Sequence, residues 1–171
     1  MKNEKLISIV IPIYNGAKYI SNIYTNIMNQ TYRPIELIFV NDGSKDDSEN
    51  VLKDIVKMHN CKSEIKIIIL SGPNGGIAVA RNRGMAASTG EYVMFVDQDD
   101  WLEKDCVEKL MQVAGLTDAD MVIGGFRKVN QKGEILETWS LNPELSWSKY
   151  RITAPWGRLF RKSVIEAEQL E

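Results

Sequence analysis

Short apolar runs recur along the first hundred residues, and each is followed by a segment whose apolar residues return every three or four positions. Such runs predict strands buried on both faces, and the spacing of three and four predicts one face of a helix. The expected strands are residues 6–11, 35–40, 65–70 and 92–96, with a short fifth at Met121–Ile123. The expected helices are residues 20–28, 51–56, Ile77–Ala87 and 107–114. Strict alternation of this kind predicts an α/β fold with a parallel, doubly wound sheet and right-handed crossovers from residue 6 to about 123.

Beyond Gly124 the alternation ends. Two short candidate strands, Phe126–Val129 and Ile135–Trp139, flank a turn at Lys132 and Gly133, and a further helix is expected to begin near Lys162. A chain of 171 residues suits one domain with a core of its own. Nothing in the sequence indicates a second domain.

Composition excludes several functional classes. A net charge of −2 argues against bulk nucleic-acid binding, which usually brings an excess of basic residues. His59 is the only histidine, and Cys61 and Cys106 lie far apart in sequence, so a zinc site is nearly excluded and any catalytic Ser–His or Cys–His pair would have to use His59. No run approaches the roughly 18 apolar residues of a membrane-spanning helix. We therefore expect a cytoplasmic or membrane-peripheral protein with reduced cysteines.

Polar and turn-forming residues follow each of the first four expected strands directly. They occupy residues 12–16, 41–44, 72–76 and 97–100. Because the carboxyl ends of parallel strands lie on one edge of a sheet, these four segments are expected to meet there. Polar loops gathered at the ends of apolar strands are typical of a ligand crevice.

The fourth segment contains three acids among four residues, Asp97, Asp99 and Asp100. Asp97 and Asp99 are two positions apart, so in near-extended backbone their side chains point to the same side. Two convergent carboxylates can hold a hard divalent cation, and such a cation can hold a diphosphate. Asp100 and Glu103 match a capping box, so we assign Asp100 to the start of the next helix.

Other polar residues at this edge have both a structural and a functional interpretation. Asn15 and Ser44 suit the capping of the helices that follow them as well as ligand contact. Asp42 suits an Asx turn before Gly43, but its place directly after a buried strand favours a ligand role.

The glycines, the arginine and the aromatic residues near this edge also have two interpretations. Gly75 and Gly76 are turn formers, yet they precede a helix whose N-terminus could face an anion. Arg81 could reach back to the edge from that helix or could remain solvated. Tyr14 is either core filler or a face for a nucleobase. The tryptophans suit core or rim positions, although their number favours a carbohydrate-stacking surface; they are Trp101, Trp139, Trp147 and Trp156.

Five segments together resemble the family 2 glycosyltransferases. They are residues 8–15, 36–44, 80–84, 90–100 and 155–162, in the family's order and spacing. The resemblance implies a GT-A fold, in which alternating strands and helices form a Rossmann-like, three-layer α/β/α structure around a mainly parallel sheet. It also implies a single domain over residues 1–171, with a donor-binding core at about 6–123 and an incomplete acceptor-side segment at about 124–171.

The resemblance implies roles for individual residues. Asp42 would hydrogen-bond the uracil of a UDP-sugar, and Arg81 would assist at the base. Asp97 would lie near the ribose and the metal, and Asp99 would bind a Mn²⁺ or Mg²⁺ ion that bridges the donor diphosphate. The full set implied to bind the nucleotide-sugar is Pro12, Tyr14, Asn15, Asp42, Asn74, Arg81, Asp97 and Gln98.

The implied reaction is inverting, metal-assisted transfer of the sugar to a glycan, lipid-linked or polysaccharide acceptor, as in bacterial polysaccharide biosynthesis. Its general base is commonly an Asp or Glu beyond the segment that contains Trp156, and no matching motif is present before the chain stops. Glu166, Glu168 and Glu171 are instead interpreted as exposed helix charges. We therefore expect a chain that binds UDP and metal but transfers sugar poorly, with a missing C-terminal part that could carry peripheral membrane association.

Two other classes of protein remain as alternatives. The first is a nucleotide-sugar-binding module without catalysis. The second is a nucleotidyltransferase-like enzyme, which would normally carry a glycine-rich, basic loop after the first strand. Residues 12–16 of this chain, Pro-Ile-Tyr-Asn-Gly, do not match such a loop.

Overall fold

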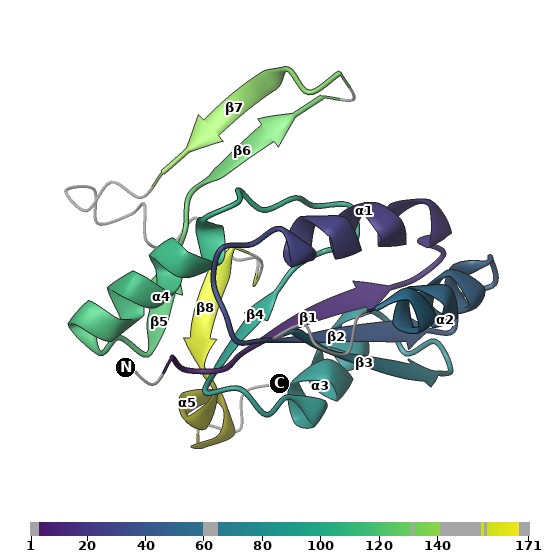
Figure 1. Cartoon of the computed structure of the whole chain (residues 1–171), viewed down its shortest axis with the longest axis horizontal. Coiled ribbons are helices and arrows are strands. Elements are labelled where there is room, and N and C mark those ends of the chain that lie inside the picture. The colour runs from purple at the N-terminus through teal and green to yellow at the C-terminus, as the bar shows by residue number, and fades with distance from the viewer. Residues whose placement is uncertain (1–3, 60–64, 131, 141–154, 156, 168–171) are drawn as a thin grey trace.

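The computed structural model describes residues 4–59, 65–130, 132–140, 155 and 157–167. Strands and helices alternate along most of this chain (Figure 1). The helices are α1 (Ala17–Met28), α2 (Ser48–Met58), α3 (Ile77–Ala87), α4 (Cys106–Thr117) and α5 (Lys162–Ala167). The strands are β1 (Ile7–Ile13), β2 (Ile35–Asp42), β3 (Ile65–Gly72), β4 (Tyr92–Phe95), β5 (Met121–Ile123), β6 (Phe126–Val129), β7 (Ile135–Trp139) and β8 (Arg158–Arg161). None of the described helices is long and apolar enough to cross a membrane.

Six strands form the central sheet in the order β3-β2-β1-β4-β8-β5. β1 pairs in parallel with both β2 and β4, and β2 pairs in parallel with β3. Ile7 lies beside Ile35 on one side and Tyr92 on the other, so the carboxyl ends of β1, β2 and β4 reach the same edge. This arrangement confirms the predicted α/β architecture around a mainly parallel sheet.

The far side of the sheet differs from the prediction in one strand, β8, which was not predicted from the sequence. β8 lies between β4 and β5 and pairs antiparallel with both. Leu159 of β8 is fully buried, but Arg158 and Arg161 bound the two apolar residues of this strand. So short an apolar stretch between arginines carries little strand signal. β5 itself runs in the same direction as β4, because both strands pair antiparallel with β8, so the predicted direction of β5 is correct and only its neighbour differs from a continuous parallel series.

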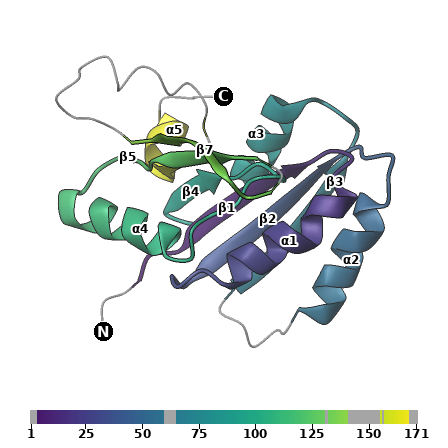
Figure 2. The same ribbon diagram turned by 90° about the horizontal axis from the view of Figure 1, so that it is seen from above.

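Helices cover both faces of the sheet, which gives three layers (Figure 2). α1, α2 and α4 contribute to one core, where Ile23, Leu52 and Leu110 pack with the sheet. α3 packs on the opposite face over a second, smaller core. A Cβ atom on Gly84 of α3 would lie 2.2 Å from Cγ1 of Val10, so this close approach of helix to sheet requires glycine, as the small residues in α3 predicted.

β6 and β7 form a separate two-stranded hairpin that stands away from the central sheet (Figure 1). Both strands have the bounds predicted from the sequence. Phe126 and Trp139 stack across the hairpin with their ring centroids 5.6 Å apart. Gly133 has a φ of +80° in the turn between the strands, a conformation that favours glycine.

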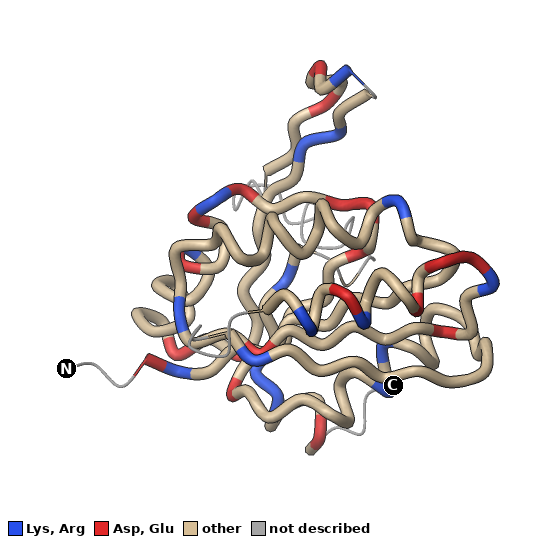
Figure 3. Tube along the Cα trace, turned by 45° about the vertical axis from the view of Figure 1, so that its right-hand side comes forward, with Lys and Arg blue, Asp and Glu red and all other residues tan. Residues whose placement is uncertain are grey.

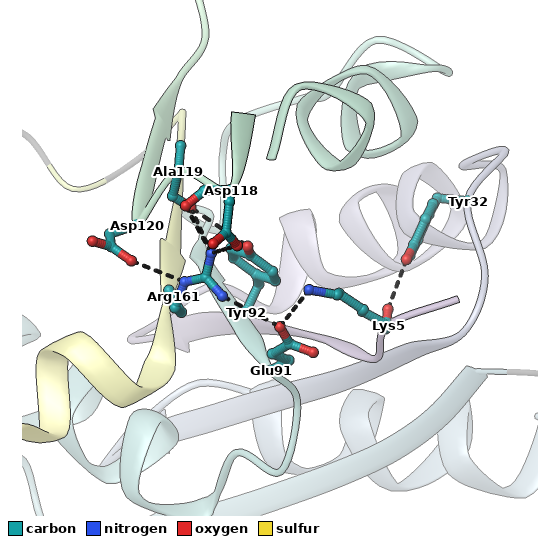
Figure 4. A network of polar contacts seen from close by, with 8 residues as sticks. All are labelled: Lys5, Tyr32, Glu91, Tyr92, Asp118, Ala119, Asp120 and Arg161. Carbon is teal, nitrogen blue, oxygen red and sulfur yellow. Dashed lines mark hydrogen bonds and ion pairs between the residues drawn. The ribbon is translucent and has the colours of Figure 1, made fainter. Parts of the chain in front are cut away.

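Arg161 fastens β8 to the end of the sheet away from the carboxyl ends of the parallel strands (Figure 4). Its Nη2 donates to Oδ1 of Asp118 at 2.6 Å, and its Nε forms an ion pair with Oδ1 of Asp120 at 2.9 Å. The guanidinium also lies over the ring of Tyr92, 5.3 Å from the centroid. These contacts attach the antiparallel strand and the turn before β5 to β4.

Candidate functional site

A cavity of about 480 Å³ opens at the carboxyl ends of β1, β2 and β4, next to the start of α3. Its lining residues are Pro12, Ile13, Tyr14, Asp42, Asn74, Gly76, Ile77, Ala80, Asp97, Gln98 and Asp99. The structure thus brings together residues from all four segments that were expected to meet at this edge. Of the residues implied to bind the donor or the metal, Asn15 and Arg81 are the ones that do not line the cavity.

Asp42 ends β2 and holds the start of α3. Its Oδ1 accepts a hydrogen bond from the amide of Gly75 at 2.9 Å, and its Oδ2 accepts one from the amide of Gly76 at 2.8 Å. Arg83 Nη1 adds a longer contact of 3.3 Å to Oδ1. The amides that could have faced an anionic ligand are therefore engaged by a carboxylate of the chain itself, and Asp42 lies both at the helix N-terminus and at the cavity wall.

Arg81 acts on the cavity through Asp97. Its Nη2 donates to Oδ1 of Asp97 at 2.6 Å, and both side chains are largely buried. A short charge-assisted hydrogen bond of this kind fixes the orientation of the carboxylate. Arg81 therefore supports an acidic residue of the cavity wall from behind rather than lining the wall itself.

The turn from Asp97 to Asp100 concentrates negative charge beside the cavity, which Asp97 and Asp99 line. The amide of Asp100 donates to the carbonyl of Asp97 at 3.1 Å and closes the turn. Desolvation, followed by the charges of Asp97 and Asp99, raises the pKa of Asp100 to about 6. Like charges this close disfavour full ionisation and would be relieved by a bound cation.

The assignment of Asp100 to a helix cap is wrong. α4 begins at Cys106 with Asp105 at its N-cap position, five residues beyond Asp100. The intervening chain is held elsewhere: the amide of Leu102 donates to Oδ1 of Asn26 at 2.9 Å, and Glu103 forms an ion pair with Arg127. These contacts across the fold delay the helix, and the local capping-box pattern does not reveal them.

Side chains from the loop after β2 and from the first residue of α2 hold the start of α1. The amide of Asn15 donates to Oγ of Ser44 at 3.0 Å, that of Gly16 to Oγ of Ser48 at 3.0 Å, and that of Ala17 to Oδ2 of Asp46 at 3.0 Å. Burial would raise the pKa of Asp46, but hydrogen bonds from the hydroxyl and amide of Ser48 and from the amide of Ala17 outweigh it and hold the pKa below its usual value. Ser48 and Asp46 were not identified from the sequence, where only their closeness to Ser44 could have suggested a common task.

The capping interpretation of Asn15 and Ser44 is therefore wrong. Gly16 and Asp47 are the N-cap residues of α1 and α2, and neither makes a side-chain cap hydrogen bond. Asn15 has a φ of +48°, and its Oδ1 accepts from the amide of Lys45 at 2.8 Å. Asn15 thus links two loops beside the cavity.

The aromatic residues expected near the edge separate in the structure. Tyr14 lines the cavity with 45% of its surface exposed, so it is not core filler. Trp101 is 64% exposed just beyond the acidic turn, and Trp139 belongs to the β6–β7 hairpin. Trp147 and Trp156 lie outside the described residues.

Charges of both signs are distributed along the described chain (Figure 3). The whole sequence carries a net charge of −2.

Two solved structures share this architecture. S. aureus TarS 1–349 in complex with UDP-GlcNAc matches with a TM-score of 0.79 at 21% identity, over 96% of this chain and 47% of that one. The mannosyltransferase PcManGT from Pyrobaculum calidifontis, in complex with GDP-Man and Mn²⁺, matches with a TM-score of 0.70 at 20% identity, over 98% of this chain and 47% of that one. These likenesses confirm the predicted GT-A fold.

Sequence comparison gives the family. The putative glycosyltransferase EpsH of Bacillus subtilis is 31% identical over 175 residues, which cover 96% of this chain and 49% of EpsH. The chain therefore spans about half the length of that relative. The family described as glycosyl transferase family 2 matches residues 8–166. With nearly its whole length covered by that match, the chain belongs to glycosyl transferase family 2.

Proposed function

We propose that the cavity binds a UDP-sugar together with a divalent cation, as the donor side of an inverting sugar transfer. The observation that carries this proposal is the place of Asp99. Its carboxylate lines the cavity, is exposed, and has no hydrogen bond or ion pair with any other residue of the described chain. Asp42 and Asp97 line the same cavity, but backbone amides and arginines already engage them.

The cavity wall suits the two parts of a nucleoside diphosphate. Pro12, Tyr14, Ile77 and Ala80 supply apolar and aromatic surface for a base, and the acidic turn lies at the same cavity for a metal-bound diphosphate. The volume of about 480 Å³ is in the range of small-molecule sites. The complexes of TarS with UDP-GlcNAc and of PcManGT with GDP-Man support a nucleotide-sugar as the donor class.

The residues present fit Mn²⁺ or Mg²⁺, since Asp99 and Asp97 offer carboxylate oxygens on one turn. Within the described residues, no three His, Cys, Asp or Glu side chains converge as a metal site. Most ligands of the ion would then be diphosphate oxygens and water, which is usual for Mg²⁺ held by one or two carboxylates. When bound, the ion would neutralise charge on the departing nucleoside diphosphate.

The acceptor in this proposal is a hydroxyl of a glycan, a lipid-linked glycan or a polysaccharide. Attack on the anomeric carbon needs a general base near that hydroxyl. Glu166 does not suit this task, because it lies on α5 and pairs with Lys162 at 3.2 Å. Glu168 and Glu171 lie outside the described residues. The base is thus left unassigned, and the chain's own role is to bind and orient the donor.

Calorimetric titration of UDP in Mn²⁺ and in EDTA tests this assignment. We expect the wild type to bind UDP in Mn²⁺ and to lose at least about tenfold in affinity in EDTA. Asp99→Asn should abolish this metal dependence, because an amide is a neutral and weaker ligand for a hard cation.

Asp54→Asn is the matched control, since Asp54 is an exposed residue of α2 paired with Lys57. It should bind UDP as the wild type does. Equal UDP affinity with Mn²⁺ and with EDTA, or wild-type behaviour of Asp99→Asn, would overturn the metal assignment. Stronger binding of GDP than of UDP would overturn the choice of uracil.

A further inference from the structure

Gln98 lies between the two acids assigned to the metal, yet its side chain is engaged by a different loop. Its Oε1 accepts a hydrogen bond from the amide of Tyr14 at 3.1 Å, and its Nε2 donates to the carbonyl of Tyr14 at 3.3 Å. The side-chain amide thus pairs with both backbone groups of one residue. We propose that Gln98 is a positioning residue, which holds the aromatic wall formed by Tyr14 at a fixed place relative to the acidic turn.

The loop that carries Tyr14 depends on such contacts from outside. The four consecutive amides from Tyr14 to Ala17 donate to side chains of other segments, namely Gln98, Ser44, Ser48 and Asp46. Three of these acceptors belong to the segment after β2. Gln98 is the one that comes from the acidic turn after β4, so it connects the metal side of the cavity to the wall of Tyr14.

This connection bears on ligand binding because both partners line the cavity. Tyr14 is 45% exposed there, and Asp97 and Asp99 flank Gln98 in sequence. A nucleoside diphosphate that contacts both places needs them at one fixed separation. A rigid link removes the entropic cost of ordering the loop during binding.

Gly16 supports the same interpretation. Its φ of −111° is available to any residue, so backbone conformation does not require glycine here. A Cβ atom on Gly16 would, however, lie 2.2 Å from Oε1 of Gln98. The absence of a side chain at position 16 therefore leaves room for the Gln98 side chain.

The test is Gln98→Met, which keeps the length of the side chain and removes both hydrogen bonds. This inference rests on the proposed donor, so the experiment includes a readout that needs no ligand. Amide hydrogen exchange at Tyr14 should accelerate about tenfold in Gln98→Met, while exchange at Asn15, whose amide donates to Ser44, should stay unchanged. Gln112→Met, at an exposed position of α4, is the matched control and should leave both rates as in the wild type.

The binding readout separates positioning from direct metal contact. Gln98→Met should weaken UDP binding about tenfold in Mn²⁺ and change the affinity for Mn²⁺–pyrophosphate by less than about twofold, because pyrophosphate has no base to contact Tyr14. An equal loss for both probes would overturn the proposal in favour of a direct role at the metal. Unchanged exchange at Tyr14, or unchanged UDP affinity, would also overturn it.

A double-mutant cycle gives independent evidence. Gly16→Ala should displace Gln98 and weaken UDP binding about as much as Gln98→Met does. In a Gln98→Ala background, the added Cβ meets no Oε1 atom, so Gly16→Ala should cause no further loss of UDP affinity. Additive losses would overturn the link between these two positions. Failure of the wild type to bind UDP would overturn the proposed donor, and exchange at Tyr14 would still decide whether Gln98 holds this loop.

Discussion

The two ends of strand β2 each hold one end of helix α3. At the carboxyl end, Asp42 accepts hydrogen bonds from the amides of Gly75 and Gly76, just before α3 begins. At the amino end, Glu36 accepts one from the amide of Thr89, just after α3 ends. The six-residue separation of the two acids corresponds to about 20 Å of strand, and the eleven residues of α3 to about 17 Å of helix. One strand therefore fastens the helix that borders the cavity at both of its ends.

The two carboxylates differ in what remains open to a ligand. The Glu36 side chain is fully buried and accepts hydrogen bonds from Ser8 at 2.7 Å, from Thr89 through both its amide and its hydroxyl, and from Lys66 at 3.1 Å. The Asp42 side chain is 4% exposed, accepts from fewer groups and lines the cavity. Both carboxylates are buried on the same strand, but Glu36 is enclosed by its donors whereas Asp42 also lines the cavity.

We expect the largest effect on stability, from a change of Glu36 at the amino end of β2. We expect Glu36→Gln to lower the free energy of unfolding by about 3 kcal/mol, because its NH₂ group would face hydrogen-bond donors in a site without solvent. Lys66 contributes little to this figure, since its side chain is 65% exposed. UDP affinity of the folded protein should change by less than about twofold, since the cavity lies at the other end of the strand. Urea unfolding and calorimetry measure the two quantities.

The stability lost in Glu36→Gln should depend on pH. Burial would raise the pKa of Glu36, but hydrogen bonds from Thr89, Ser8 and Lys66 outweigh burial and hold the pKa below its usual value of 4.5. A depressed pKa stabilises the fold above the unfolded value, and this contribution is lost as the pH falls through the folded pKa. The difference between wild type and Glu36→Gln should therefore persist at neutral pH and shrink in acid. Glu137→Gln on the exposed strand β7 should stay within about 0.5 kcal/mol of wild type, and an equal loss there would contradict the assignment.

Apolar periodicity was enough to predict most of the fold. β5, β6 and β7 have the predicted bounds, and the first four strands begin at or next to the predicted residues. The information was local, since a strand buried on both faces needs a continuous apolar run. β8 was missed because only Leu159 and Phe160 are apolar, and pairing with β4 and β5 makes it a strand.

The sequence was enough to predict which acidic residues form the candidate site, but not which residues they contact. The position of Asp97 and Asp99 after a buried strand placed them at the cavity. The pairing of Arg81 with Asp97, and of the Gln98 amide with Tyr14, depends on how separate segments of the chain pack together. No spacing along the chain encodes such contacts, so the sequence indicated the residues and the structure gave their orientation.

We expect the next largest effect on stability from a change of Asp42 at the carboxyl end of β2. Asp42→Asn should lower the free energy of unfolding by about 2 kcal/mol, because one amide of the Gly75–Gly76 pair would lose its acceptor. Unlike Glu36→Gln, it should also weaken UDP binding at least about tenfold, since the altered group lines the cavity. Urea unfolding and UDP titration of both variants compare the two ends directly. A variant that loses stability but binds UDP as the wild type does would make Asp42 a second purely structural carboxylate.

We expect the smallest effect from removing the Arg83 guanidinium, one of the hydrogen-bond donors to Asp42. Arg83 approaches Oδ1 of Asp42 at 3.3 Å, and its side chain is 35% exposed, so solvent screens the pair. We therefore expect Arg83→Met to lower the free energy of unfolding by less than about 1 kcal/mol and to change UDP affinity by less than about threefold. Of the donors to Asp42, Arg83→Met removes only the guanidinium. Asp42→Asn also disturbs the hydrogen bonds from the amides of Gly75 and Gly76, so the two variants together show how much each kind of donor contributes. If Arg83→Met matched Asp42→Asn in both measurements, the arginine rather than the N-terminus of α3 would anchor the carboxylate, and the parallel between the two ends of β2 would fail.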